Sequence, residues 1–532
     1  MIYKLLIITC VLIFPCTLQP QSLRVRINPA ETRQEIEYFT ASDAWSGNFV
    51  GMYWDNKEKE RIAKYLFSQK TDETGAPEGI GLSLWRVNLG AGTLEQDSAD
   101  ILPPHRRAES FLTKDGNCYD RGKCSGQQYF MQKAAEYGCN NFLLFSNSPP
   151  VQYTQNGKGW SSSLHNANIQ PDAYGKFASY LADAADYFVN TKRWNISFIS
   201  PINEPQVEWT SPRQEGTPWA NSEMKKMFVA LDEALSNKGL NDVKMLLGES
   251  ADLSALYEKS EKLRQRFPAG EAPDMQIKTF FDPAGPHYIG NLKHLPKLIA
   301  GHSYHSHATN QQLKTTREKL KTAADKYGID FHQSEWCMLP GINKAMDGFL
   351  PGWECDNYAG MDVALLLGRL IYGDMVYANA KSWGYWKAME INGNHALISL
   401  FPKNGNLSGG GAVRTNKLLW ALGNYSFFIR PGYTRIALEG ADDLNTVVGS
   451  AYLSPEKLRI VIVFVNSSFD NISVKTILPG NDAKKIKKAT VFCTNEHTDL
   501  ANIRNMKNMN TDITLTPRSI ITLVLDLAPD AF

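Results

Sequence analysis

Two glutamates in this chain stand where short apolar runs end, in surroundings typical of catalytic carboxylates. Glu204 lies in Ile-Ser-Pro-Ile-Asn-Glu-Pro, and Glu335 lies in His-Gln-Ser-Glu-Trp-Cys. Cleavage of a glycosidic bond needs two carboxylates, one to give a proton and one to attack or to activate water. Asn-Glu-Pro is also a common turn sequence, so the prediction of a glycosidic site depends on whether the fold brings the two glutamates together.

The runs that end in these glutamates belong to a long series of strand-like segments between residues 36 and 429. Amphipathic segments with helical spacing separate them, as in Asp172–Thr191. Strands that alternate with helices in this number predict a (β/α)8 TIM barrel. An open doubly wound sheet is the alternative, but no glycine-rich phosphate loop follows the first strand. The expected strands are Glu37–Trp45, Ile80–Leu89, Asn141–Ser146, Ile196–Asn203, Val243–Glu249, Leu298–His305, Asp330–Glu335 and Lys381–Lys387.

The character of the sequence changes after Arg430-Pro-Gly. Short β-rich runs follow, separated by Asn, Asp, Gly and Pro, and they predict a β-sandwich. Leu23–Ile27 precedes the barrel, and we expect it to pair with the C-terminal sheet. The expected units are a signal peptide at 1–21, an N-terminal strand of the sandwich at 22–30, the barrel at 31–429 and the sandwich at 430–532.

Composition excludes some classes of protein. The 532 residues exceed one hydrophobic core, and a formal net charge of +1 argues against a dedicated nucleic-acid binder. An early lysine followed by an apolar stretch that ends at Phe14 predicts a signal peptide, with lipidation at Cys16 as an alternative. We therefore expect an exported protein (secreted, periplasmic or at the cell surface), monomeric and without a transmembrane segment. Cys118 and Cys124 are the best candidates for a disulfide.

The predicted barrel gives the two glutamates a common location. Glu204 would end the fourth strand and Glu335 the seventh, and active sites collect at the carboxyl ends of barrel strands. Strands three apart in a ring of eight face each other across a narrow mouth. Cleavage with retention of configuration needs the carboxyl groups about 5–5.5 Å apart, and inversion needs a wider gap. The sequence leaves this choice open.

At these positions the chain resembles the retaining barrel glycosidases of clan A, and the sandwich built from both termini resembles glycoside hydrolase family 30. The resemblance implies that Glu204 is the acid/base and Glu335 the nucleophile. It also implies that Arg86 and Tyr304 stabilise the ionised form of Glu335, and that Asn203 holds the sugar 2-hydroxyl. The sugar-binding residues expected from this resemblance are Asp43, Trp45, Arg86, Asn147, Asn203, Tyr304, His305 and Trp386.

The resemblance implies neither a cofactor nor a metal. His302, His305 and His307 form a metal-like cluster, but no carboxylate motif completes it, and hydrogen bonding around the site is the preferred interpretation. Glu249 and Glu390 also end predicted strands and are interpreted as substrate contacts or members of ion pairs. Trp160 and Trp209, in long loops, are open between sugar platforms and loop packing.

The third strand bears on the substrate, which we expect to be a polysaccharide or oligosaccharide. Phe145-Ser-Asn-Ser-Pro-Pro looks most like the endo-β-1,6-galactanase branch, and Asn147 or Asp43 would meet the axial O4 of galactose. The resemblance thus predicts hydrolysis of β-1,6-galactan, such as the side chains of arabinogalactan. The alternatives are a β-1,6-glucanase, a xylanase, a glucosylceramidase-like enzyme, a transglycosylase or a non-catalytic carbohydrate-binding protein.

Overall fold

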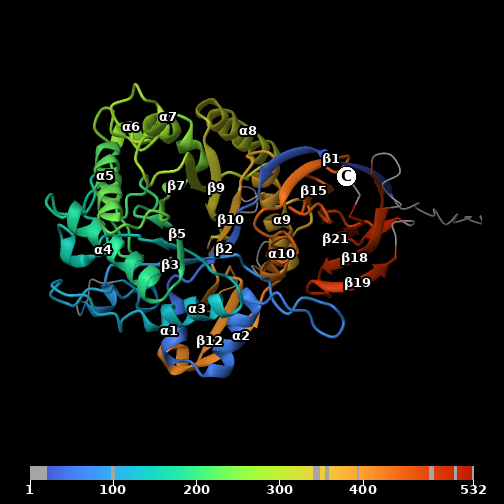
Figure 1. The fold of residues 1–532 in the computed structure, drawn as a ribbon, viewed down its shortest axis with the longest axis horizontal. Helices are drawn as coiled ribbons and strands as arrows, with labels where there is room; N and C mark the ends of the chain where they lie inside the picture. The colour runs from blue at the N-terminus through green and yellow to red at the C-terminus, as the bar shows by residue number, and fades with distance from the viewer. Residues whose placement is uncertain are drawn as a thin grey trace, which may run out of the picture.

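The protein folds into a barrel and an adjoining β-rich unit (Figure 1). The computed structural model describes residues 21–96, 102–339, 348–353, 357, 359–391, 393, 395–478, 485–507 and 512–529. Almost the whole of the expected signal peptide at 1–21 lies outside these residues, and so does Cys355. Among the described helices, none is long and apolar enough to cross a membrane.

A ring of parallel strands forms the centre of the larger unit. Its order is β6-β5-β4-β3-β2-β10-β9-β8-β7. β6 and β7 are two pieces of one fifth strand, separated at Leu246, whose N–H still bonds the carbonyl of Ile199 at 2.9 Å. The (β/α)8 barrel is therefore confirmed. The strands are β2 (Tyr38–Ser42), β3 (Leu84–Asn88), β4 (Asn141–Phe145), β5 (Asn195–Ser200), β6 (Lys244–Met245), β7 (Leu247–Ser250), β8 (Leu298–His302), β9 (Asp330–Glu335) and β10 (Ser382–Lys387).

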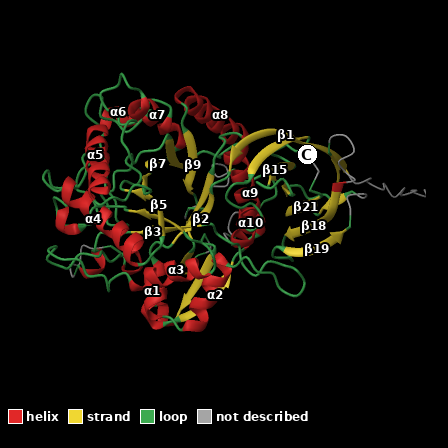
Figure 2. Cartoon of the chain, in the orientation of Figure 1, coloured by secondary structure: helices red, strands yellow, loops and turns green. Residues whose placement is uncertain are grey.

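Helices cover the outside of the ring, as their apolar spacing predicts (Figure 2). The ends of α8 follow its sequence: Thr309 accepts a hydrogen bond from the N–H of Gln312, and Gly328 ends the helix in the left-handed region with φ of 62°. The helices are α1 (Ser46–Tyr53), α2 (Asn56–Phe67), α3 (Ser125–Glu136), α4 (Tyr174–Asp186), α5 (Asn221–Asn237), α6 (Glu261–Arg266), α7 (Gln276–Phe281), α8 (Asn310–Tyr327), α9 (Met361–Val376) and α10 (Lys417–Ser426).

The β-rich unit is built from the C-terminal segment together with the first strand of the chain. β1 (Gln21–Glu35) pairs antiparallel with β14 and parallel with β17, which confirms the expected crossing back from the N-terminus. The strands join in the order β19-β18-β21-β16-β15-β14-β1-β17-β20. The others are β14 (Thr434–Glu439), β15 (Val447–Leu453), β16 (Arg459–Asn466), β17 (Ile472–Ile477), β18 (Ile486–Thr494), β19 (Ala501–Met506), β20 (Ile513–Leu515) and β21 (Ser519–Leu527).

One strand of this unit shows how the two units share an interface. In β16, Ile460, Ile462 and Phe464 belong to a core inside the β-rich unit, whereas Val461, Val463 and Val465 belong to the core of the barrel. Successive side chains of a strand point to opposite faces, so a strand that is apolar throughout is buried on both sides. The barrel side of the sheet packs on α9 and α10. The two units therefore bury apolar surface against each other.

Some features differ from the sequence-based expectation. A small sheet of β11 (Met389–Ile391), β12 (Ile398–Pro402) and β13 (Gly411–Thr415) follows the last barrel strand and was not predicted. β19 was also not predicted, because its sequence is largely polar. The expected disulfide is wrong: Cys118 and Cys124 are both free, with Cys118 exposed and Cys124 buried at the start of α3. The unit boundaries at residues 30 and 429 stay predictions.

Gly368 of α9 allows the closest contact of that helix with the sheet. A methyl group there would lie 2.9 Å from Cγ2 of Val465 and 3.1 Å from Cδ1 of Ile520. Both Gly368→Ala and the matched Gly175→Ala gain helix propensity. We expect Gly368→Ala to be the less stable of the two by about 1–3 kcal/mol, because only its methyl group overpacks the interface. Gly175, in α4, has no atom within 4 Å of an added methyl group. Equal melting temperatures for the two variants would contradict this account of the interface.

Candidate active site

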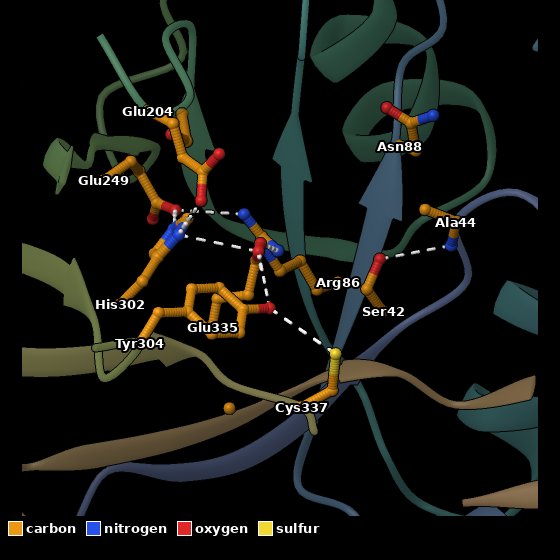
Figure 3. Close-up of polar contacts among 12 residues, drawn as sticks. Ser42, Ala44, Arg86, Asn88, Glu204, Glu249, His302, Tyr304, Glu335 and Cys337 are labelled. Atoms are coloured by element: carbon orange, nitrogen blue, oxygen red, sulfur yellow. Dashed lines mark hydrogen bonds and ion pairs between the residues drawn. The ribbon is translucent and has the colours of Figure 1, made fainter. Parts of the chain in front are cut away.

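Glu204 and Glu335 meet at the carboxyl ends of the barrel strands (Figure 3). Glu335 ends β9, and Glu204 follows β5 by four residues. One carboxylate oxygen of Glu204 lies within 4.8 Å of one of Glu335. The rim continues the strand hydrogen bonds beyond the sheet, since the N–H of Glu204 bonds the carbonyl of Glu249 at 2.9 Å, and the N–H of Ser303 bonds that of Glu335 at 3.1 Å. The backbone of the fold thus sets the distance between the two carboxylates.

A cavity of about 520 Å³ opens above the two glutamates. Six of the catalytic and sugar-binding residues expected from the sequence line it, and loop residues complete the wall. The lining residues are Trp45, Arg106, Glu204, Val207, Trp209, Arg213, Gln214, Ala251, Tyr304, His305, Glu335, Cys337, Leu339, Trp386, Lys387 and His395. Trp45 and Trp386 meet edge to face at 5.5 Å between ring centroids, so they form one aromatic corner. Aromatic faces and carboxylates together suit a sugar.

Glu335 is held by two donors. Arg86 Nη1 lies 2.6 Å from its Oε2, and the Tyr304 hydroxyl donates to its Oε1 at 3.2 Å. The guanidinium of Arg86 also rests on the ring of Phe145, with Cζ 3.8 Å from the ring centroid. These contacts hold the carboxylate in one orientation below the cavity.

His302 and Arg86 share a third carboxylate, that of Glu249. His302 Nε2 lies 2.9 Å from Glu249 Oε2, and Arg86 Nη2 lies 3.0 Å from the same oxygen. The other imidazole nitrogen, Nδ1, lies 3.0 Å from Glu204 Oε1 and 3.5 Å from Glu335 Oε1. Both glutamates at the cavity floor are therefore tied to a buried network, in which Glu249 and His302 are fully buried.

The pKa values of this network follow from burial and from its opposite charges. Burial alone would lower the pKa of His302, but the surrounding carboxylates, Glu335 first, raise it to about 10. Burial raises the pKa of Glu335, and the charges of His302 and Arg86 oppose that rise. For Glu249 the balance is reversed: burial acts to raise its pKa, and Arg86 and His302 outweigh it and lower the value. His302 is therefore an imidazolium at neutral pH.

Three side chains at the cavity floor are of types that can bind a metal ion. Glu204, His302 and Glu335 offer one atom each within 4.8 Å of one another. An imidazole binds a metal through a deprotonated nitrogen, and both nitrogens of His302 face carboxylates and carry protons. These side chains therefore form a hydrogen-bond network around the His302 imidazolium and do not suit a metal ion. His305 and His307 do not join it: His305 is exposed, and His307 is buried against Trp336.

The backbone is strained at three residues of this rim. Glu204 and Glu249 have φ of 45°, and His305 has φ of 56°. Non-glycine residues adopt this left-handed region rarely, at a cost of about 1–3 kcal/mol, and such residues cluster at functional sites. Two of the three are carboxylates of the network. Both of these side chains point toward His302 (Figure 3).

Four of the expected sugar-binding residues do not line the cavity, and one of them, Arg86, binds Glu335 instead. Asp43 is buried and accepts hydrogen bonds from the N–H of Asn88 at 2.9 Å and from Gln127 Nε2 at 2.8 Å, and burial raises its pKa to about 7. Asn147 and Asn203 are buried as well. Within the described part of the chain, both polar atoms of the Asn147 side chain and Oδ1 of Asn203 have no hydrogen-bond partner. Their roles in sugar binding stay predictions.

The structure also shows what Glu249, Glu390 and Trp209 contact. Glu390 forms an ion pair with Lys387, and Glu249 forms ion pairs with Arg86 and His302, so both are members of ion pairs. The indole of Trp209 lines the cavity and donates to the carbonyl of Glu204 at 3.2 Å, which fixes the loop that follows β5.

Sequence reasoning missed the basic residues of the cavity wall. Arg106 and Arg213 come from the loops after β3 and β5, and His395 comes from the segment before β12. No periodic pattern predicts where a loop side chain lies, so the sequence carries no signal for them. Lys387 is the exception, since it ends the eighth expected strand beside Trp386.

The sequence matches the family model described as O-Glycosyl hydrolase family 30 over residues 22–398. The chain belongs to this family. A conserved exported protein from Bacteroides fragilis has a similar crystal structure, with a TM-score of 0.84 and 31% identity, and the match covers 94% of this chain and 99% of that one. The catalytic domain of xylanase C from Talaromyces cellulolyticus is similar in fold, with a TM-score of 0.64, 19% identity and coverage of 94% and 99%.

An endo-β-1,6-galactanase from Hypocrea rufa is 26% identical over 231 residues. The match covers 40% of this chain and 48% of the length of that relative. Membership of family 30 places this chain among the glycosidases, in agreement with the barrel and the paired carboxylates.

The raised pKa of His302 predicts how stability depends on pH. Because the folded state holds this proton up to about pH 10, and the unfolded chain releases it near 6.5, the folded state binds more protons between these values. The free energy of unfolding should therefore fall as pH rises through this window. His302→Gln should remove much of this slope, whereas His497→Gln, at an exposed position of the β-rich unit, should keep it.

Urea unfolding of the three proteins at about pH 6, 8 and 9.5 measures the slope. An unchanged slope in His302→Gln would show that the network does not hold the proton.

Proposed function

We propose that the protein is a retaining glycosidase that acts by double displacement, with Glu335 as the nucleophile and Glu204 as the acid/base. The observation that carries the proposal is the approach of the two carboxylates, within 4.8 Å between oxygens at the floor of one cavity. Retaining enzymes hold their carboxyl groups about 5–5.5 Å apart, so that one attacks the anomeric carbon directly. Inverting enzymes need a wider gap for a water molecule.

The two glutamates differ in their partners, and this difference supports the assignment of roles. Glu335 faces a guanidinium and a phenol, both of which stabilise a carboxylate anion. An ionised Glu335 can attack the anomeric carbon. The carboxylate of Glu335 loses its negative charge when it bonds to the sugar and regains the charge when that bond breaks. Arg86 and Tyr304 stabilise the charged form before and after the covalent intermediate.

The role of acid requires a proton on Glu204. Arg86 and His302 carry two positive charges, and Glu249 and Glu335 carry two negative ones, so the buried network is neutral when Glu204 is protonated. His302 Nδ1–H occupies Oε1 of Glu204 at 3.0 Å. The acid proton is then carried by the other oxygen, Oε2, which is free to give it to the leaving oxygen of the substrate.

In the first step, Glu335 attacks the anomeric carbon while Glu204 protonates the departing oxygen. In the second step, Glu204 accepts a proton from water, and that water displaces Glu335 from the sugar. The proton that Glu204 loses and regains lies next to the imidazolium of His302, which keeps its own charge throughout. Trp386 and Trp45 would carry the sugar, and Asn203 would hold its 2-hydroxyl.

For the substrate we propose β-1,6-galactan. The 26% identity to an endo-β-1,6-galactanase supports it, with Phe145-Ser-Asn-Ser-Pro-Pro on the third strand. Asn147, buried and without a hydrogen-bond partner among the described residues, would meet the axial O4 of galactose. A signal peptide at 1–21 and an exported location complete the proposal, in agreement with the exported protein of similar structure.

Purified protein should release reducing sugar from β-1,6-galactan faster than from β-1,6-glucan, xylan or a glucosylceramide analogue. The physical reason is that a pocket with a polar group at O4 favours the axial hydroxyl. Initial rates on the four substrates at equal concentration measure the preference. A higher rate on any of the other three substrates would replace galactan as the proposed substrate, and the proposed glycosidase activity would still hold. Binding of a substrate without hydrolysis of any of the four would indicate a carbohydrate-binding protein.

Glu204→Gln and Glu335→Gln should each lower kcat by at least about 10²–10⁴-fold without loss of the fold, since one lacks the acid and the other the nucleophile. Azide should restore turnover to Glu335→Gly and give a glycosyl azide of inverted configuration, because a small anion fits where the carboxylate was removed. The anomer of the first product, followed by NMR, should be that of the substrate. Normal activity in either Gln variant would refute the assigned roles.

A further inference from the structure

A buried carboxyl group joins two loops of the cavity wall. Glu215 lies in the loop of residues 201–220, between β5 and α5, and its side chain is fully buried. Its Oε2 accepts a hydrogen bond from the N–H of Ala91 at 3.0 Å, and its Oε1 lies 2.6 Å from the hydroxyl oxygen of Thr93. Ala91 and Thr93 belong to the loop after β3. One side chain therefore connects the loops that follow the second and the fourth strands of the barrel.

Both of these loops contribute side chains to the catalytic cavity. Trp209, Arg213 and Gln214 line it and come from the same loop as Glu215, with Gln214 next to it in the sequence. Arg106, from the loop after β3, lines it as well. A movement of one loop away from the other would therefore move the wall that faces the substrate.

The elements packed around Glu215 bring no opposite charge to it. The loop after β3 supplies the two hydrogen-bond partners, and the loop after β4 supplies Gly159, where an added methyl group would lie 3.3 Å from Glu215 Cγ. α4 supplies Tyr180, and the charge of Glu215 acts to raise the pKa of its phenol. Among the described residues, no lysine, arginine or histidine forms an ion pair with Glu215. Three other buried glutamates of the site each form an ion pair with an arginine or a lysine: Glu249, Glu335 and Glu390.

A buried carboxyl group without a cation favours its neutral form. Burial raises the pKa of Glu215 to about 7, although the hydrogen bonds from Thr93 and Ala91 act to lower it. The contacts also suit the neutral acid. Oε1–H can donate to the Thr93 hydroxyl over the short distance typical of O–H···O bonds, while Oε2 accepts from Ala91.

We propose that Glu215 is a positioning residue, which holds the loop of residues 201–220 against the loop after β3 and does so more firmly when it is protonated than when it is ionised. The position of the cavity wall toward the substrate then depends on the proton of Glu215. The proposed reaction uses neither this residue nor its proton. Contact between the loops does not depend on the proposed glycosidase activity, whereas its effect on the substrate does.

The direction of the pH effect follows from proton linkage. With the loop open, Glu215 contacts water and loses its proton near the ordinary pKa of 4.5, whereas with the loop closed it keeps the proton up to about pH 7. The closed loop therefore binds more protons between these values. Its population relative to the open loop should fall as pH rises through this window, by as much as about 10²-fold, and stay constant above it.

Hydrogen exchange tests this contact without any substrate. Glu215→Gln imitates the neutral acid, because the amide can accept from Ala91 and donate to Thr93. Peptides from residues 205–214 should exchange at similar rates in the two proteins at about pH 5, and about tenfold faster in the wild-type protein at about pH 8. Comparison of the two proteins at one pH removes the effect of pH on the exchange reaction itself. Equal rates at both pH values would overturn the proposal.

Thr93→Val is a second variant, which keeps Glu215 and removes one of its two partners. Peptides from residues 205–214 should exchange faster in this variant than in the wild-type protein at both pH values, and unchanged rates would also overturn the proposal. Glu223→Gln is the matched control. Glu223 accepts hydrogen bonds from the N–H groups of Ala220 and Ala167, and burial raises its pKa too, but it does not line the cavity. Its replacement should leave the exchange of residues 205–214 unchanged.

Kinetics test the effect on the substrate, on whichever of the four glycans the protein hydrolyses. At about pH 8, KM should be about threefold lower in Glu215→Gln than in the wild-type protein, and at about pH 5 the two values should agree. At each pH the two proteins should have the same kcat, because Glu204 and Glu335 are unaltered. Equal KM at about pH 8, despite a difference in exchange, would overturn the role of Glu215 in positioning the wall. Absence of hydrolysis of every glycan would refute the proposed glycosidase, and the exchange measurements would still decide whether Glu215 holds the loop.

Discussion

The buried charges of Arg86, His302 and Glu249 are the constraint on which the rest of this active site depends. Burying charge is costly unless each charge has a partner, and a partner removed from such a set leaves a penalty of about 3–5 kcal/mol. Here each cation contacts more than one carboxylate: Arg86 contacts Glu249 and Glu335, and His302 contacts Glu249, Glu204 and Glu335. Glu249 does not face the cavity, yet it fixes both cations and so fixes the two glutamates that do.

A second buried cluster supports this network from behind. Asp374 of α9 accepts hydrogen bonds from Ser303 at 3.0 Å, from Arg317 Nε at 2.7 Å and from Trp383 Nε1 at 2.9 Å. Ser303 stands between His302 and Tyr304 in the sequence, so the cluster fixes the rim of β8 against α8, α9 and β10. α9 in turn packs on the sheet of the β-rich unit. The β-rich unit therefore contributes to the rigidity of the site without lining it.

The site divides into a rigid floor and a variable wall. Floor residues come from strand ends, where the backbone pairing of the barrel fixes their positions. Wall residues such as Arg106, Trp209 and Arg213 come from loops, whose lengths and sequences the barrel does not constrain. The residues of the floor would carry out the reaction, and the residues of the wall would select the chain that binds. A glycosidase can thus keep one reaction and change its substrate.

The sequence by itself determined the parts of this protein that follow from periodicity. Alternating strand and helix patterns predicted the barrel, and short β-rich runs after Arg430 predicted the second unit. The same patterns placed Glu204 and Glu335 at strand ends, because a buried strand is apolar and its polar end is visible in the sequence. The small sheet formed by β11, β12 and β13 had no such pattern and was missed.

Only the tertiary structure decided which residues meet. Glu249 lies near the end of β7 and Asp43 directly follows β2, and the two look alike in sequence. Yet Glu249 joins the charge network, and Asp43 bonds Asn88 and Gln127 away from the cavity. Cys118 and Cys124 lie close in sequence, yet one is exposed and the other buried. The physical reason is that contacts between distant segments depend on the closure of the ring and on loop paths, neither of which local spacing records.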